Sequence, residues 1–149
     1  MNALRAQSEA IYATTRIVVG FLFALHGVEK MFGVISRDEP VALFSLLGTA
    51  GVIELVAGVM ICLGLKTSWA AFISSGQMAV AYFYAHQPRA FWPLENDGER
   101  SILYCFIFLY FAAKGSGILS VDHTMTQSNG GYDGWSQPPT TPISGFPKQ

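Results

Sequence analysis

Four long apolar stretches occupy most of the chain, and short polar segments separate them. The stretches cover residues 11–32, 41–65, 69–84 and 102–119. Each is close in length to the roughly 20 residues that an α-helix needs to cross the hydrocarbon core of a bilayer. The pattern therefore predicts an all-α fold, an integral membrane four-helix bundle that crosses the membrane four times.

Small residues recur at helical spacing in the first two stretches. Gly20, Ala24 and Gly27 share one face of the first stretch, and Gly51 and Gly58 share one face of the second. Small side chains allow another helix to approach closely inside a membrane. We therefore expect both faces to lie against neighbouring helices.

The chain changes character after Asp122. Residues 1–122 form the predicted four-span membrane domain, whereas Gly, Pro, Ser and Thr dominate residues 123–149. A segment of that composition buries too little apolar surface to fold by itself. We therefore expect an extended, irregular C-terminal tail that a partner subunit holds in place, with Trp135, Ile143 and Phe146 as its anchors.

The composition agrees with a membrane protein and excludes some other classes. Hydrophobic residues make up 51% of the chain and charged residues 13%, against about 25% charged residues in soluble domains. The net charge of −1 provides no basic surface for nucleic acid. Cys62 and Cys105 fall near opposite membrane faces of the predicted bundle, so we expect both thiols to be unpaired.

The predicted topology places both termini on the same side of the membrane. The first stretch lacks a small-x-small cleavage site, so we interpret it as an uncleaved span rather than a signal peptide. Basic residues are slightly more frequent on the side of the termini, five against four. By the positive-inside rule we expect a multi-pass protein of a bacterial or archaeal inner membrane, with cytoplasmic termini.

Ionisable and amide side chains interrupt the apolar stretches. A charged group at the centre of a bilayer costs about 3 kcal/mol or more unless it has a partner or reaches water. Such groups therefore mark either a functional site or a structural network. The side chains in question are Arg16, His26, Glu29, Lys30, Glu54, Gln77 and Lys114.

The topology gathers several of these residues at the membrane face opposite the termini. Quinone carbonyls need hydrogen-bond donors, which histidine and lysine provide, and quinone reduction needs proton carriers such as carboxylic acids. The candidate site for a quinone or similar polar head group consists of His26, Glu29, Lys30, Glu54, His86 and Glu99.

A purely structural network is the alternative. In that case Glu54 pairs with Lys30 or with Arg16 and fixes the bundle, while Lys114 and Asp122 form further ion pairs. A haem held by His26 and His86 is a weaker hypothesis, because the chain has no haem attachment motif. The sequence contains no clustered ligands that predict a metal site.

With these residues in place, the chain resembles the DoxX family of small four-helix membrane proteins over about residues 11–122. The resemblance implies a redox context, since some members look like the membrane subunit of a thiosulfate:quinone oxidoreductase. It adds weight to Arg16, Lys30, Glu54, His86 and Glu99 as a site. The matching positions, in order, are Arg16, Gly20, Gly27, Lys30, Glu54, Gly58, Gly64, Leu65, Met78, Ala79, His86, Asn96, Gly98, Glu99, Gly115, Ser116, Gly117 and Asp122.

These observations favour an accessory membrane subunit of a larger electron-transfer or energy-transducing complex, which stabilises assembly through its helices and tail. The alternative is a quinone-interacting membrane subunit of a DoxX-type oxidoreductase. A small transporter is disfavoured, because four short spans leave little room for alternating access. We expect no catalysis by the isolated chain, no cofactor of its own beyond a bound quinone or lipid, and membrane lipids and other subunits as partners.

Overall fold

The computed structural model describes residues 2–128, and the regular secondary structure of these residues is helical. The all-α prediction is confirmed for these residues, which contain no strand. The expected anchors Trp135, Ile143 and Phe146 lie outside the described residues. The helices are α1 (Asn2–Ala6), α2 (Ser8–Phe32), α3 (Leu46–Leu63), α4 (Thr67–Ala81), a π-helical turn η1 (Tyr82–His86), α5 (Glu99–Lys114) and α6 (Val121–Ser128).

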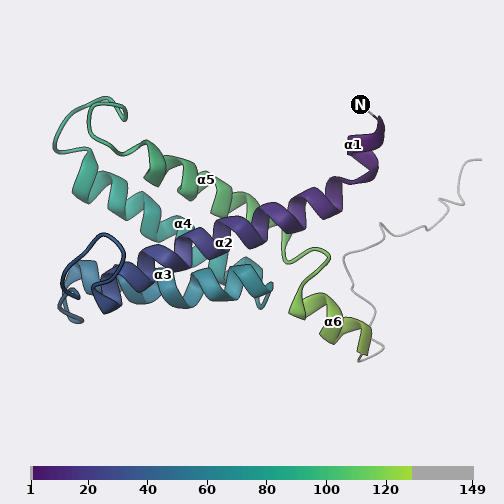
Figure 1. Ribbon diagram of the computed structural model, residues 1–149. Coiled ribbons are helices and arrows are strands. Elements are labelled where there is room, and N and C mark those ends of the chain that lie inside the picture. The colour runs from purple at the N-terminus through teal and green to yellow at the C-terminus, as the bar shows by residue number, and fades with distance from the viewer. Residues whose placement is uncertain (1, 129–149) are drawn as a thin grey trace, which may run out of the picture.

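The longest helices pack as two pairs. Helix α2 packs along α3, α4 packs along α5, and α3 joins the pairs through its contact with α4. Figure 1 shows that the two long loops, residues 33–45 and 87–98, lie at the same end of the molecule. We call this the loop end, and we call the opposite end, which carries α1 and α6, the terminal end.

The helix ends differ from the apolar stretches for local reasons. Helix α3 starts at Leu46 rather than near residue 41, because Pro40 precedes it and the Ser45 side chain accepts a hydrogen bond from the Gly48 amide as an N-cap. Helix α5 ends at Lys114 rather than near residue 119. Gly115 and Gly117 follow with φ angles of 82° and 63°, which terminate the helix.

Two of the helices, α2 and α3, are by themselves long and apolar enough to span a membrane. Helix α4 continues without a break into η1, so helical backbone extends from Thr67 to His86. Many large apolar side chains of the helices are exposed on the outer surface, among them Phe21, Phe72 and Phe106. A soluble domain rarely exposes so many large apolar side chains.

Helices α2 and α3 are in backbone contact at their glycines. A Cβ atom added to Gly58 would lie 2.5 Å from the Ala24 amide nitrogen, and one added to Gly27 would lie 2.3 Å from that of Leu55. The prediction that the small-residue faces lie against other helices is confirmed for these positions. This close approach leaves no room between the two helices for a side chain.

Aromatic side chains fill the space between α2 and α5. The ring of Phe23 lies 4.6 Å from that of Phe108, and the ring of Tyr12 lies 5.6 Å from that of Phe111, measured between centroids. All four residues are buried. These large side chains hold α2 and α5 further apart than the glycines hold α2 and α3, and a cleft begins beyond them at the loop end.

Candidate functional site

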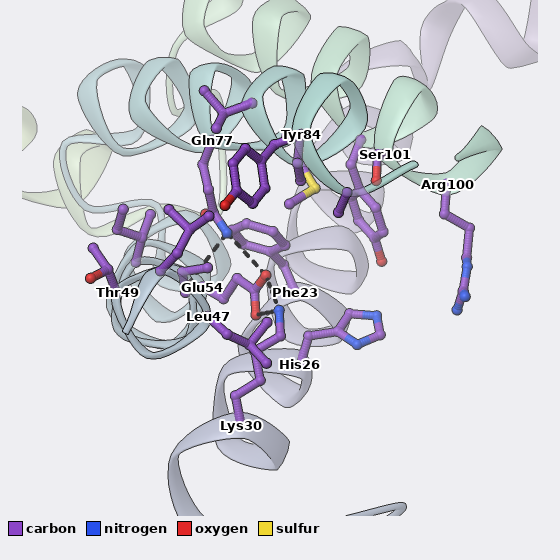
Figure 2. A pocket seen from close by; sticks show the side chains of 18 of the residues that line it. Phe23, His26, Lys30, Leu47, Thr49, Glu54, Gln77, Tyr84, Arg100 and Ser101 are labelled. Atoms are coloured by element: carbon purple, nitrogen blue, oxygen red, sulfur yellow. Dashed lines mark hydrogen bonds and ion pairs between the residues drawn. The ribbon is translucent and has the colours of Figure 1, made fainter. Parts of the chain in front are cut away.

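A cleft of about 850 Å³ lies at the loop end, among all the long helices. Residues of α2, α3, α4, η1 and α5 line it. Figure 2 shows side chains from these helices converging on the space, with Glu54 and Lys30 at its floor. Most of the lining is apolar, and the polar groups within it are the candidates for specific interactions.

The floor of the cleft is a charged network. The Lys30 Nζ atom lies 2.5 Å from both carboxylate oxygens of Glu54, which is only 2% exposed. The Gln77 amide donates a hydrogen bond of 3.0 Å to the same carboxylate (Figure 2). Glycine at position 51 allows this arrangement, since a Cβ atom there would lie 2.9 Å from the Lys30 Cβ.

The structure distinguishes between the two expected partners of Glu54. Lys30 binds it directly, because Lys30 lies beside Gly51, about one turn of α3 from Glu54, which is within reach of the lysine side chain. Arg16 lies elsewhere, at the terminal end. The network thus joins three helices, α2, α3 and α4, through one carboxylate.

The mouth of the cleft carries further polar groups. The His26 side chain is 42% exposed, and its Nδ1 atom lies 3.7 Å from the Glu29 carboxylate. The Ser36 hydroxyl also donates to Glu29. Asp97 and Arg100 line the mouth on the opposite side. These groups are accessible to a ligand, whereas Glu54 is reached only through the cleft.

His86 has a defined tautomer. Its Nδ1 atom lies 2.9 Å from the backbone oxygen of Asn96. A carbonyl oxygen only accepts hydrogen bonds, so Nδ1 carries the proton, and in the neutral ring Nε2 is then an acceptor. Neutral His86 can therefore accept a proton from a ligand hydroxyl, but it is not a donor to a ligand carbonyl.

The element that carries His86 is the π-helical turn η1. Its characteristic hydrogen bond runs from the Gln87 amide to the Tyr82 oxygen, with a length of 2.9 Å. Turns of this type often occur at functional sites. Asn96, which is 1% exposed, completes the support by donating to the Ala90 oxygen and accepting from the Gly98 amide.

The structure brings together five of the six predicted site residues. His26, Glu29, Lys30, Glu54 and His86 all line the cleft. Glu99 does not line it; this side chain is the exposed first residue of α5. The acidic and basic groups at that wall come instead from two residues close to it in the chain, Asp97 and Arg100.

Sequence reasoning left several polar residues of the cleft out of the site, among them Gln77, Arg100 and Tyr104. Gln77 had the same signal as Glu54, a polar group inside an apolar stretch, and that signal was sufficient to include it. Arg100 and Tyr104 lie one turn apart on α5 and both face the cleft. Nothing in their spacing separates them from ordinary residues at a helix start.

Of the three residues predicted to form structural ion pairs, Lys114 forms one, whereas Asp122 and Arg16 bind backbone groups. Lys114 pairs with Glu9, with 2.8 Å between nitrogen and oxygen. Asp122 accepts a 3.0 Å hydrogen bond from the Lys66 backbone amide instead of pairing with a side chain. Arg16 likewise binds carbonyl oxygens rather than a carboxylate.

Arg16 is fully buried and binds three backbone oxygens. Its Nη1 atom donates to Ile61 at 2.6 Å and to Cys62 at 2.9 Å, and its Nη2 atom donates to Leu119 at 2.7 Å. The first two oxygens belong to the last turn of α3, where carbonyl groups lack partners in the helix. Arg16 thereby fastens the end of α3 and the segment before α6 to α2.

Taken together, these features define a class of protein: a helical membrane protein with a polar network at the floor of an apolar cleft. The sequence model of the DoxX family matches residues 11–87. An uncharacterized protein of Haemophilus influenzae is 37% identical over 134 residues, which cover 83% of this chain and 96% of that protein. No solved structure matches the chain. The chain belongs to the DoxX family.

Proposed function

We propose that this DoxX protein crosses the membrane four times and binds the head group of a quinone in its cleft, as the membrane component of a redox system. The observation that carries the proposal is the Lys30–Glu54–Gln77 network at the floor of a mostly apolar cleft. Ionisable groups inside a membrane domain mark functional sites by default.

Helix lengths support four spans. Besides α2 and α3, the continuous helix Thr67–His86 has 15 residues in α4 and 5 in η1, which corresponds to about 30 Å. Helix α5 is shorter, with 16 residues, and packs along α4 with exposed apolar residues on its outer face. A four-span arrangement leaves the backbone hydrogen bonds of each span satisfied within its own helix.

The polar groups fit a quinone ring. The Lys30 ammonium has three N–H donors, of which Glu54 occupies two, so one donor remains for a quinone carbonyl. His26 and Arg100 provide further donors at the mouth. The His86 Nε2 atom is suited to accept from a quinol hydroxyl, and Glu54 and Glu29 are suited to carry protons.

The experiment that tests the proposal is a binding titration with a short-chain benzoquinone. The protein is reconstituted in lipid nanodiscs, and affinity is measured by isothermal titration calorimetry. We expect Glu54→Gln and Lys30→Met to weaken binding by about tenfold or more, a difference of about 1.4 kcal/mol. Glu39→Gln is the matched control, because that carboxylate is exposed in loop 33–45. Equal affinity of all variants would refute the proposed site.

One observation favours a second function, that of an accessory subunit in a larger electron-transfer complex. Lys30 and Gln77 already satisfy the Glu54 carboxylate, so the network is complete as a structural link between helices. If this is its role, Glu54→Gln and Lys30→Met reduce the recovery of partner subunits upon co-purification. The turnover of the complex that does assemble then stays unchanged.

A further inference from the structure

We propose that the ligand of the cleft carries a long apolar tail, and that this tail leaves the cleft sideways between α3 and α4 into the lipid. The inference rests on the proposed function of the cleft as a head-group site and specifies the class of ligand: an amphiphile that reaches the site from the bilayer. The head group occupies the polar floor, and the tail occupies the opening between the two helices.

The wall of the cleft formed by α3, α4 and η1 includes partly exposed side chains. Leu47 on α3 and Ile73, Val80 and Tyr84 on α4 and η1 line the cleft. The same side chains are between 42% and 70% exposed on the surface of the protein. None of these side chains is enclosed by the described residues, so we infer that the α3–α4 wall does not seal the cleft.

Helices α3 and α4 are in closest contact at the terminal end. At the terminal end, Ala57 and Ile61 of α3 and Ala70 and Ala71 of α4 belong to the buried core. Toward the loop end the helices diverge from their connecting turn (Figure 1). There Gln77 reaches across to α3, with its amide 3.4 Å from the Ala50 oxygen.

The exit toward the loop end and the opening between α3 and α4 differ in polarity. His86, Asp97 and Arg100 line the exit toward the loop end, where an alkyl tail would meet water at a cost of about 0.8 kcal/mol per CH₂ group. The side opening faces the outer surface of the helices, where lipid is as apolar as the tail. The tail therefore remains in an apolar environment only if it leaves sideways.

Depth is consistent with this route. Glu54 is eight residues from Leu46, the first residue of α3, which corresponds to about 12 Å along the helix. The head-group site therefore lies within the apolar length of the helices rather than at their end. A ligand dissolved in the bilayer reaches this depth without crossing the polar mouth.

The test compares two ligands that share one head group: a benzoquinone with a decyl tail and the same ring without the tail. The variant Ile73→Trp narrows the side opening, and Phe72→Trp is its control, because Phe72 is 60% exposed and does not line the cleft. Affinities are measured in nanodiscs by calorimetry. Because partition of each ligand into the lipid is the same for every variant, comparison between variants isolates the protein contribution.

We expect Ile73→Trp to weaken binding of the decyl ligand by about tenfold and binding of the tail-free ring by less than about twofold. Phe72→Trp leaves both affinities unchanged. A second pair guards against misfolding of the first variant: Leu47→Trp on the α3 wall, with the outward-facing Val56→Trp as control. Each variant is first checked for a monodisperse profile in size-exclusion chromatography.

The possible outcomes separate the two proposals. If the wild type binds neither ligand, the proposed head-group site is refuted. If the wild type binds both, and both wall variants retain full affinity for the decyl ligand, the side route is refuted and the head-group site stands. Equal losses of both ligands in both wall variants also refute the side route, since the bulky side chain then obstructs the head-group site itself.

Discussion

The polar network at the floor of the cleft depends on the carboxylate of Glu54. It is almost fully buried, and its partners come from two other helices. Removal of one member of a buried ion pair leaves an uncompensated charge and costs about 3–5 kcal/mol, whereas replacement of both members with apolar groups is often neutral. The contribution of the pair to stability is therefore measurable separately from ligand binding.

We predict that Lys30→Met lowers the free energy of unfolding by about 3–5 kcal/mol, and that the double variant Lys30→Met/Glu54→Leu recovers most of this loss. The measurement is SDS titration in mixed micelles, followed by circular dichroism. Glu9→Gln serves as the control. It breaks the Lys114 pair, but the Glu9 side chain is 52% exposed, so we expect a loss of about 1 kcal/mol or less. A double variant as unstable as the single variant would contradict the prediction.

The sequence predicts which polar residues form buried interactions better than it predicts which groups they bind. Glu54 and Lys30 are recognisable because a charge inside an apolar stretch is costly unless it is paired or functional. Helix periodicity gives the face of a residue but not the reach of its side chain, so the choice between Lys30 and Arg16 for Glu54 required the structure. The carbonyl partners of Arg16 are invisible in sequence, because every residue has a carbonyl group.

At the scale of elements, contact between α2 and α3 depends on glycine. Gly58 lies against the backbone of Ala24, so a methyl group there pushes the helices apart. Gly76, on α4, has no neighbouring atom within 4 Å of an added Cβ. The two positions therefore separate the effect of packing from the effect of helix propensity.

We predict that Gly58→Ala destabilises the protein by about 1–3 kcal/mol, the typical cost of overpacking. Gly76→Ala has no such cost and removes the conformational freedom of glycine within a helix, so we expect it to stabilise the protein by about 0.5–1 kcal/mol. Thermal unfolding in detergent measures both changes. A similar shift in melting temperature for the two variants would show that contact between α2 and α3 is not tight.

The apolar stretches predict the helices well and their ends less well. The two stretches that contain α2 and α3 are long and strongly apolar, and both helices form where the pattern places them. Residues 41–45 are apolar enough to extend α3, but the cap at Ser45 prevents this, and Gly115 and Gly117, with positive φ angles, end α5 before residue 119. Backbone geometry of this kind is weakly encoded in hydrophobicity.

At the scale of the whole molecule, the structure separates two groups of exposed residues. Asp38 and Glu95 lie in the loops of the loop end, and Ser8 and Gln127 lie on helices of the terminal end. If the chain crosses the membrane four times, these two pairs face opposite compartments. From the positive-inside rule we then predict that the terminal end faces the cytoplasm.

Single cysteines test this topology in a background of Cys62→Ala and Cys105→Ala. We predict that an impermeant maleimide labels Asp38→Cys and Glu95→Cys in intact cells. It labels Ser8→Cys and Gln127→Cys only after permeabilisation. The reverse pattern would invert the orientation while keeping four spans. Labelling of one loop-end cysteine without the other would refute the four-span arrangement.

The Arg16 clamp has a consequence for how the protein tolerates acid. Its guanidinium is matched by the dipoles of Ile61, Cys62 and Leu119 rather than by an anionic side chain. Guanidinium groups stay protonated in proteins, and carbonyl oxygens do not titrate. A fall in pH therefore leaves these three hydrogen bonds unchanged, and with them the attachment of the end of α3 and of the segment before α6 to α2.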